Sequence, residues 1–293
     1  NIKMKKAKRI AVAGATGMVG QAFQNLLEKN FFPEAEIDLL ASQKSKGRSV
    51  TFRGKEHIIK DLSEYDFSYT DLALFSAGAS VSAEYAPKAV SQGCVVVDNS
   101  SCFRYDDEIA LIVPEVNGDE LSNYDLPSII ANPNCSTIQM LVALKPIYDA
   151  VGIKRITVST YQAVSGSGTA AVNELAKQTA DLLNGRDAEC SVYPKQIAFN
   201  ALPHIDTFMD NGYTKEEMKM CWETRKIFGD ENIDVSATCV RVPVFFGHSE
   251  AIQVETSEYI DEKKARGLLK RAEGVTVIDE RRDGGYPTAV HES

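Results

Sequence analysis

The stretch ANPNCSTIQM, residues 131–140, contains a cysteine between an Asn-Pro-Asn turn and apolar residues at helical spacing. Asn134 is a favourable N-cap, so we expect Cys135 in the first turn of a helix. Backbone N–H groups without intrahelical partners and the helix macrodipole stabilise a thiolate there. A small buried hydrophobic residue is the commoner role of an intracellular cysteine. The helix-start position nevertheless favours Cys135 as a nucleophile for a carbonyl carbon.

A nucleophilic thiol needs a base, and His248 is the candidate among the four histidines. His248 lies in RVPVFFGHSE, residues 241–250, a strand-like segment that begins with the cation Arg241. Taken alone, a histidine in such a segment is more often structural than catalytic. Together with Cys135 it forms the cysteine–histidine pair that activates thiols, so the catalytic interpretation is favoured.

Three glycines follow the first predicted strand in RIAVAGATGMVGQAF, residues 9–23. Gly14, Gly17 and Gly20 have a strand–turn–helix context, in which backbone N–H groups can approach a phosphate at the positive end of the helix. A tight turn without a ligand is the alternative. The position at the start of a βαβ series favours dinucleotide binding.

The residues after the second predicted strand indicate which dinucleotide binds. An acidic residue at that strand end would hold the ribose 2′-OH of NAD, whereas basic residues suit the 2′-phosphate of NADP. The sequence there is LLASQKSKGRS, residues 39–49, and the nearby acid, Asp38, lies inside the strand. Lys44, Lys46 and Arg48 favour NADP, with a solvated basic loop as the alternative.

The elements that must position these residues change in character along the chain. Up to residue 133, β-branched runs alternate with helical segments, which predicts an α/β fold with an N-terminal Rossmann-type parallel sheet. We expect strands at 9–13, 37–41, 72–76, 95–98, 111–113 and 129–131, and helices at 18–30 and 82–92. Residues 1–133 would form an NADP-binding domain.

Residues 134–293 are predicted to form an α+β catalytic and dimerisation domain with a largely antiparallel sheet. We expect helices at 136–150, 169–183 and 214–228, and strands at 154–163, 236–242 and 251–256. The last two strands are expected to be antiparallel, because each follows a turn and no crossover helix.

Composition excludes several partners. The net charge of −9 argues against nucleic acid or an anionic membrane as a partner and favours a small molecule. The six cysteines form no CxxC pair and no zinc-like cluster with histidine, so we expect no metal site. Reduced thiols and an N-terminus without a signal-peptide pattern predict a cytoplasmic protein with no membrane span.

Six motifs occur together and in a family's order: GATGMVG at 14–20, NSSCFR at 99–104, NPNCST at 132–137, YQAVSGSG at 161–168, EEMK at 216–219 and RVPVFFGHSE at 241–250. With these motifs the chain resembles aspartate-β-semialdehyde dehydrogenase. The resemblance implies a homodimer or homotetramer that uses NADPH to reduce L-aspartyl-4-phosphate to L-aspartate-4-semialdehyde with release of phosphate. That reaction serves lysine (diaminopimelate), threonine, methionine and isoleucine biosynthesis.

The same resemblance implies a role for each site residue. Cys135 would form the thioester, His248 would be the acid/base and Gln162 would orient the thioester. Arg241 and Glu216 would hold the substrate's α-carboxylate and α-amino group, Arg104 and Lys219 the phosphate, and Asn134 would assist in that pocket. The cofactor positions would be Gly14, Thr16, Gly17, Met18, Val19, Gly20, Lys44, Ser45, Ser165 and Gly166. For each charged residue the alternative is a surface salt bridge.

The sequence departs from the family pattern at residue 293, where the family normally continues with further strands and a long C-terminal helix. We expect the protein to continue too, because a Rossmann domain without that covering helix would expose apolar surface. Two other functions stay open. One is N-acetyl-γ-glutamyl-phosphate reductase, which must accept an acetylated amine. The other is a catalytically silent dinucleotide-binding regulator, which would not need Cys135, His248 and the anion-binding residues.

Overall fold

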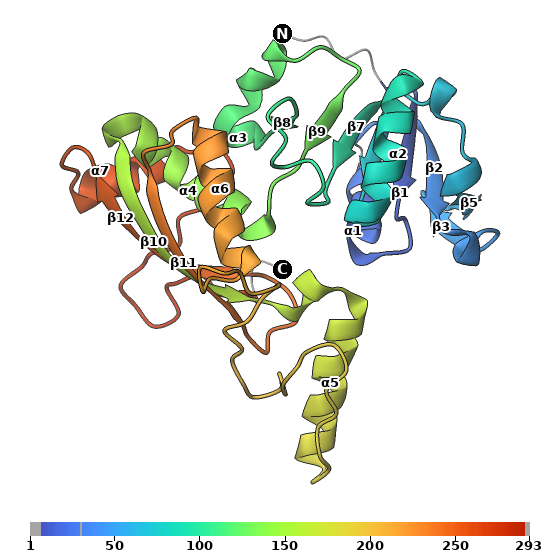
Figure 1. Ribbon diagram of the computed structural model, residues 1–293. Helices are drawn as coiled ribbons and strands as arrows, with labels where there is room; N and C mark the ends of the chain where they lie inside the picture. Colours follow the sequence, from blue (N-terminus) through green and yellow to red (C-terminus); the bar gives the residue numbers. More distant parts are fainter. Residues whose placement is uncertain (1–6, 30, 291–293) are drawn as a thin grey trace. The chain divides into compact units, whose positions relative to one another are not determined.

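The computed structural model describes residues 7–29 and 31–290, and the chain divides into two compact units, Asn1–Pro133 and Asn134–Ser293 (Figure 1). Each unit is described by itself. In the part of the chain that the structure describes, no helix has the length and apolar character that crossing a membrane requires.

The first unit contains a seven-stranded sheet in the order β5-β2-β1-β6-β7-β9-β8. Its strands are β1 (Arg9–Ala13), β2 (Glu36–Ala41), β5 (Lys60–Asp61), β6 (Leu72–Phe75), β7 (Val95–Asp98), β8 (Ala110–Leu111) and β9 (Ile129–Ala131). Every neighbouring pair in this sheet is parallel. The predicted Rossmann-type parallel sheet is therefore confirmed.

Helices cover both faces of that sheet because successive side chains of a strand point to opposite faces. Ile10 and Val12 of β1 pack in one apolar cluster with Leu27 of α1 (Met18–Glu28). Ala11 and Ala13 belong to another cluster, together with residues of α2 (Ala79–Ser91). These buried strands read as continuous apolar runs for this reason. Short helical segments complete the unit: α3 (Pro114–Asn117), η1 (Gln43–Ser45), η2 (Leu62–Glu64), η3 (Phe67–Tyr69) and η4 (Gly118–Asn123).

A hairpin that the sequence patterns did not predict lies after β2. It consists of β3 (Ser49–Phe52) and β4 (Lys55–Ile58), which pair antiparallel. Arg53 and Gly54 join them with φ angles of 50° and 68°. Two positive φ angles are typical of the turn that matches the twist of a hairpin. The turn residue Arg53 was not recognised because arginine rarely takes this conformation.

The second unit is built on a three-stranded sheet in the order β11-β10-β12. Its strands are β10 (Ile153–Gln162), β11 (Asp234–Arg241) and β12 (Ser249–Thr256). The helical elements are α4 (Cys135–Val151), η5 (Val164–Ser167), α5 (Thr169–Leu183), α6 (Lys215–Phe228) and α7 (Glu262–Leu269). The predicted α/β class with a second, α+β unit is confirmed.

The direction of β11 corrects one expectation. β12 is antiparallel to β10 as predicted, but β11 runs parallel to β10. A turn does precede β11, but it follows α6, which ends at Phe228, packs on β11 and completes a crossover between β10 and β11. A parallel neighbour requires such a crossover. The sheet is therefore mixed.

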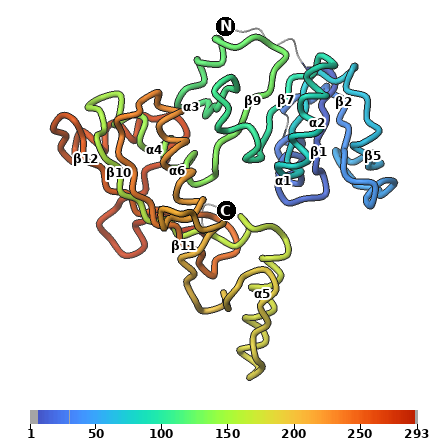
Figure 2. Tube along the Cα trace, in the orientation of Figure 1, coloured from blue at the N-terminus to red at the C-terminus, as the bar shows by residue number. Residues whose placement is uncertain are grey.

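Helix α5 and the segment that follows it form an arm of the second unit (Figure 2). The Glu174 carboxylate accepts hydrogen bonds from the backbone N–H groups of Ser191 and Val192, at 2.8 and 2.5 Å. The Gln178 side chain likewise accepts from the N–H groups of Ile197 and Ala198, at 3.0 and 3.1 Å. These side chains of α5 satisfy the backbone of a segment that has no regular structure of its own.

Candidate active site

The glycine turn of the first unit brings helix α1 against the end of β1. Gly14 has a φ angle of +85°, and its carbonyl oxygen accepts the N–H of Gly17 at 3.0 Å. A Cβ atom on Gly20 would lie 2.2 Å from that same oxygen, which only glycine avoids. Gly14 and Gly17 thus shape the turn, whereas Gly20 permits the close approach of the helix.

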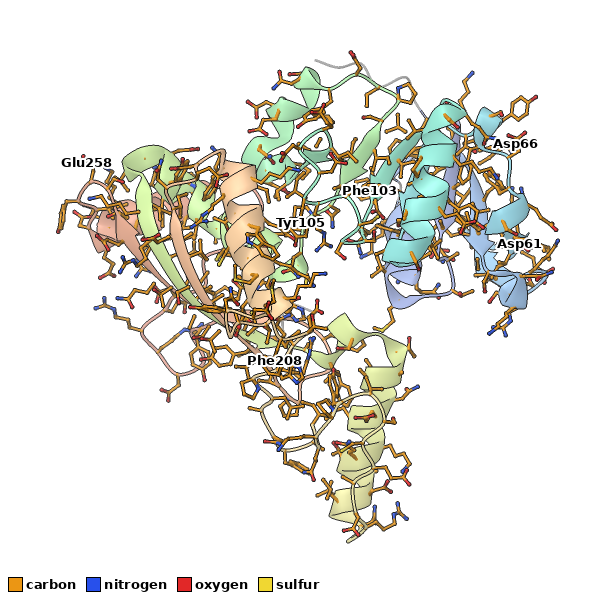
Figure 3. The ribbon with its side chains drawn as sticks, in the orientation of Figure 1. Asp61, Asp66, Phe103, Tyr105, Phe208 and Glu258 are labelled. Carbon is orange, nitrogen blue, oxygen red and sulfur yellow. The ribbon has the colours of Figure 1, made fainter. Side chains whose placement is uncertain are left out.

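A cavity of about 600 Å³ opens beside this turn. Gly14, Thr16 and Gly17 line one part of it, and residues at the carboxyl ends of β2, β5 and β6 line the rest. The latter include Ser42, Gln43, Asp61, Ser76 and Ala77, with Glu84 and Tyr85 from α2. Asp61 is labelled in Figure 3 at the edge of the parallel sheet. The crevice outside the strand ends is where open α/β sheets bind ligands, so its size and glycine lining fit a dinucleotide.

Several predicted cofactor residues lie beside the lining of this cavity. Met18, Val19, Gly20, Lys44 and Ser45 are not among its lining residues. Lys44 is exposed directly after Gln43, whereas Ser45 is buried. Lys46 forms an ion pair with Glu64, so its charge is partly committed within the protein. Asp38 accepts hydrogen bonds from Lys60 and Tyr65 inside the sheet, at 2.5 and 2.6 Å, and does not line the cavity. The sequence patterns missed Asp61 and Glu84, whose places depend on strand order.

Arg104 is held within the first unit with its guanidinium buried. Its side chain is 6% exposed. Nε donates to the carbonyl oxygen of Asn132 at 2.9 Å, and Nη2 donates to that of Asn99 at 3.1 Å. Backbone oxygens thus fix the plane of the guanidinium without removing its charge, which suits an arginine that binds an oxyanion.

In the second unit, α4 begins at Cys135, directly after the predicted N-cap Asn134. The Asn134 Oδ1 atom accepts the backbone N–H groups of Ser136 and Thr137, at 3.0 and 3.2 Å. Cys135 is exposed, whereas Asn134 and Ser136 on either side are buried. The thiol therefore projects from the positive end of a 17-residue helix.

The other predicted residues of this unit meet on one face of its sheet. Thr160 and Gln162 of β10 are buried and lie in register with the buried Cys239 and Arg241 of β11. Side chains two apart in a strand share a face, so Gln162 and Arg241 are neighbours at the strand ends. Thr160 Oγ1 donates to Gln162 Oε1 at 2.9 Å. The Gln162 amide nitrogen is thereby left to donate to Glu216.

Glu216 on α6 is the centre of a buried polar network. Its Oε1 atom accepts from Asn134 Nδ2 at 2.9 Å and from Gln162 Nε2 at 3.1 Å, while Oε2 contacts Lys219 Nζ at 3.0 Å. Burial alone would raise the pKa of Glu216, but the charge of Lys219 and these hydrogen bonds lower it below its ordinary value. Lys219 also contacts Asp206 at 2.7 Å. The network holds a charged carboxylate beside the start of α4.

Arg241 and His248 converge on the backbone of Ala163, just after β10. Arg241 Nη1 donates to the Ala163 carbonyl oxygen at 2.7 Å, and the Ala163 N–H donates to His248 Nδ1 at 2.9 Å. Gly166 lies against both, since a Cβ atom there would be 3.1 Å from Arg241 Nη1 and 3.4 Å from His248 Nε2. Among the described residues, the buried Nε of Arg241 has no hydrogen-bond partner. A guanidinium has five N–H donors, so those not bonded to the Ala163 backbone suit a carboxylate.

The surroundings of His248 favour its neutral form. Burial and the positive charge of Arg241 lower the pKa of His248 to about 4, against a smaller opposing effect of Glu216. Because Nδ1 accepts a hydrogen bond, we assign the proton of the neutral ring to Nε2. A ligand carboxylate on Arg241 would offset the lowering charge and raise the pKa of His248.

Glu250, two residues after His248, is a buried carboxyl group that the sequence patterns missed. It pairs in register with Thr160, and α4 contacts its strand. Neither carboxyl oxygen is accessible to solvent or has a partner in hydrogen-bonding geometry among the described residues. Burial raises the pKa of Glu250 to about 8, partly offset by the nearby polar side chains of Gln139 and Ser136. Glu250 is therefore largely a neutral carboxylic acid at neutral pH.

Four of the other five cysteines are less exposed than Cys135, whereas Cys190 is also exposed. Burial raises the pKa of both Cys94 and Cys239 to about 12. Cys102 and Cys221 also have pKa values above the ordinary one because of burial. Within residues 7–29 and 31–290, no group of three or more His, Cys, Asp and Glu side chains could hold a metal ion.

Two family models match the chain. The NAD binding domain of semialdehyde dehydrogenase matches residues 9–124, and the semialdehyde dehydrogenase dimerisation domain matches residues 144–293. Aspartate-semialdehyde dehydrogenase of Legionella pneumophila is 59% identical over 98% of this chain and 83% of the relative. Aspartate-semialdehyde dehydrogenase 2 of Vibrio cholerae is 53% identical over 99% of this chain and 85% of the relative.

Solved structures agree with these matches. The crystal structure of aspartate semialdehyde dehydrogenase II from Vibrio cholerae, complexed with ASA, has a TM-score of 0.94 at 53% identity, covering 97% of this chain and 84% of that one. The aspartate semialdehyde dehydrogenase structure with NADP from Candida albicans has a TM-score of 0.70 at 27% identity, covering 90% of this chain and 76% of that one.

Proposed function

Because the chain belongs to the aspartate-semialdehyde dehydrogenase family, we propose that it uses NADPH to convert L-aspartyl-4-phosphate to L-aspartate-4-semialdehyde and phosphate through a thioester on Cys135. One observation carries the proposal. Asn134 links the turn before the exposed Cys135 to the buried charge of Glu216. A nucleophile is thereby held beside groups that suit the charges of an amino acid.

The residues of the second unit account for the chemistry. The Cys135 thiolate attacks the C4 carbonyl carbon, a C–S bond forms, and the bond to phosphate breaks. NADPH, when bound, supplies the hydride that reduces the resulting thioester. His248, once protonated, gives its Nε2 proton to the oxygen that gains charge and takes it back as the C–S bond breaks, which releases the aldehyde and returns the thiolate. Gln162 is proposed to orient the thioester.

Charged residues are proposed to hold the substrate. Arg241 binds the α-carboxylate through its guanidinium, and Glu216 binds the α-ammonium group. Lys219, placed between Glu216 and Asp206, is proposed as a phosphate ligand, as is Arg104 in the first unit. Asn134 assists from its position at the start of α4. Carboxylate binding at Arg241 raises the pKa of His248, so a larger fraction of His248 carries the proton that it donates when substrate is present.

The substrate assay separates this proposal from N-acetyl-γ-glutamyl-phosphate reductase. An acetylated amine carries no charge and would leave the Glu216 carboxylate without a cationic ligand group. With NADP⁺ and phosphate, we expect kcat/KM for aspartate semialdehyde to exceed that for N-acetylglutamate semialdehyde by at least about 10³-fold. Equal rates, or a preference for the acetylated compound, would favour the reductase. Absence of turnover with either would favour the silent regulator.

The cofactor is proposed to be NADP, bound at the cavity beside Gly14, Thr16 and Gly17, with Met18, Val19 and Gly20 continuing the turn. The end of β2 supplies Ser42 and Gln43 where an NAD enzyme has an acid, and Lys44 follows in an exposed position. Ser45 completes that segment, while Ser165 and Gly166 are proposed cofactor contacts of the second unit.

Cofactor preference tests the role of Lys44. NADPH should be preferred to NADH by at least about tenfold in kcat/KM, and Lys44→Ala should remove most of that preference. Lys46→Ala is the matched control, because Lys46 already pairs with Glu64 and should contribute less. Equal use of both cofactors by the unmodified protein would contradict NADP specificity.

Two wider features complete the proposal. The family model over residues 144–293 describes a dimerisation domain, which supports a homodimer or homotetramer. We place the reaction in the cytoplasm, within lysine, threonine, methionine and isoleucine biosynthesis, as the family resemblance implies.

A further inference from the structure

Helix α6 buries two carboxylates that both bind Asn134. Glu216 accepts the Asn134 side-chain amide at 2.9 Å, and Glu223 Oε2 accepts the Asn134 backbone N–H at 2.6 Å. Glu216 and Glu223 are seven residues apart, about two helical turns, so they lie on the same face of α6. Glu223 is completely buried.

The polar groups of Asn134 bind two different helices. Its backbone N–H and side-chain amide point to α6, while Oδ1 accepts the N–H groups of Ser136 and Thr137. Asn134 is thus shared between α6 and the first turn of α4. The residue that follows it is Cys135.

We propose that Glu223 is a positioning residue for the Cys135 nucleophile, acting through the backbone of Asn134. This proposal rests on the proposed function and gives α6 two roles. Glu216 and Lys219 bind the substrate, and Glu223 fixes the backbone next to Cys135 so that the thiol faces the bound substrate. The 2.6 Å hydrogen bond joins buried groups for which water does not compete, which suits a fixed register. Displacing a reacting atom by about 1 Å costs roughly 10²-fold in rate.

Neighbouring Glu217 provides a matched control. It is buried on the same helix, and its carboxylate accepts the backbone N–H groups of Thr214 and Cys239, at 2.8 and 3.0 Å. These two partners belong to the start of α6 and to β11, so the bonds of Glu217 fix elements other than the turn before α4. Substitution of Glu217 therefore measures what loss of a buried carboxylate in α6 does to stability alone.

The experiment compares Gln and Leu at positions 223 and 217 in the full chain. Gln keeps an acceptor oxygen, whereas Leu leaves the Asn134 N–H without its partner. Relative to the unmodified enzyme, we expect kcat to fall about three- to tenfold in Glu223→Gln and about 10²-fold or more in Glu223→Leu, with KM for NADPH within about twofold. Glu217→Gln should keep kcat.

Amide hydrogen exchange supplies a readout that does not depend on activity. In Glu223→Leu the amides of residues 134–137 should exchange at least about tenfold faster, while those of Glu217→Leu should not. Unchanged kcat in a folded Glu223→Leu protein, or equal losses at both positions, overturns the proposal. If Leu prevents folding, an unchanged kcat in Glu223→Gln overturns it instead. The rate of the unmodified protein tests the proposed function separately.

Discussion

At the scale of single residues, burial sets the protonation of groups that would otherwise be charged. Glu250 and His248 lie two residues apart at the start of β12, and burial moves their pKa values in opposite directions, to about 8 and about 4. Both groups are therefore mainly neutral near pH 7. Glu216, which is buried more deeply, stays charged because Lys219 and three side-chain hydrogen bonds stabilise its anion.

Substitution of Glu250 by Gln tests this argument. The folded-state pKa of Glu250 lies above the unfolded value, so its stabilising protonation is complete below about pH 4.5 and is lost as pH rises to about 8. Glu250→Gln is neutral at every pH. We expect similar unfolding midpoints for the two proteins near pH 5, and a variant more stable by on the order of a few kcal/mol near pH 9.

Thermal unfolding across that pH range measures the difference. His248, whose pKa is lowered, makes both proteins more stable as pH rises from about 4 to 6.5, and this contribution cancels in the comparison. A difference that does not change with pH would show that Glu250 is ionised in the folded protein at neutral pH.

At the scale of elements, close approach of backbones shapes the glycine turn. Helix α1 contacts the turn where a Cβ atom on Gly20 would lie 2.2 Å from the Gly14 carbonyl oxygen. Such a contact forces backbone atoms apart, because no flexible side chain is there to yield. The turn that is proposed to bind the cofactor thus depends on a residue that does not line the cavity.

Gly20→Ala should consequently weaken both folding and cofactor binding. We expect a loss of stability of about 1–3 kcal/mol, and weaker NADPH binding because α1 is displaced from the turn. Gly118→Ala is the control, since Gly118 has a φ of −60° and its Cβ would lie 3.9 Å from the nearest side-chain atom. Chemical denaturation and fluorescence titration with NADPH measure the two effects. Equal stability of both variants would refute the crowding argument.

At the scale of the whole molecule, the proposed tasks fall in two compact units. The glycine turn and its cavity belong to Asn1–Pro133, whereas Cys135 belongs to Asn134–Ser293. Removal of the nucleophile should therefore spare cofactor binding. This separation distinguishes a chemical defect from a folding defect.

Cys135→Ala is expected to abolish turnover while the dissociation constant for NADPH stays within about twofold of the unmodified value. Cys190→Ala is the matched control, because Cys190 is also exposed but does not begin a helix. Alkylation near neutral pH, followed by peptide mass spectrometry, should label Cys135 first. Faster labelling of Cys190, or residual turnover without Cys135, would assign the nucleophile elsewhere.

Features that depend on neighbouring residues could be predicted from the sequence alone. The glycine turn after β1, the buried parallel strands and the start of α4 at Cys135 under its Asn134 cap are all confirmed. Each follows from local rules, namely the positive φ of glycine, the continuous apolar run of a doubly covered strand and the cap of a helix. The family motifs then connected these local features to a reaction.

Contacts between distant residues were decided only by the tertiary structure. Glu223 binds Asn134 across 89 positions of the sequence, and Glu216 binds Gln162 across 54. The pairing of Lys46 with Glu64 and the place of Asp61 in the cavity likewise had no local signal. Residue spacing defines which face of a helix or strand a side chain occupies. Which residue it contacts on that face depends on the order of the strands and on the crossover connections between them.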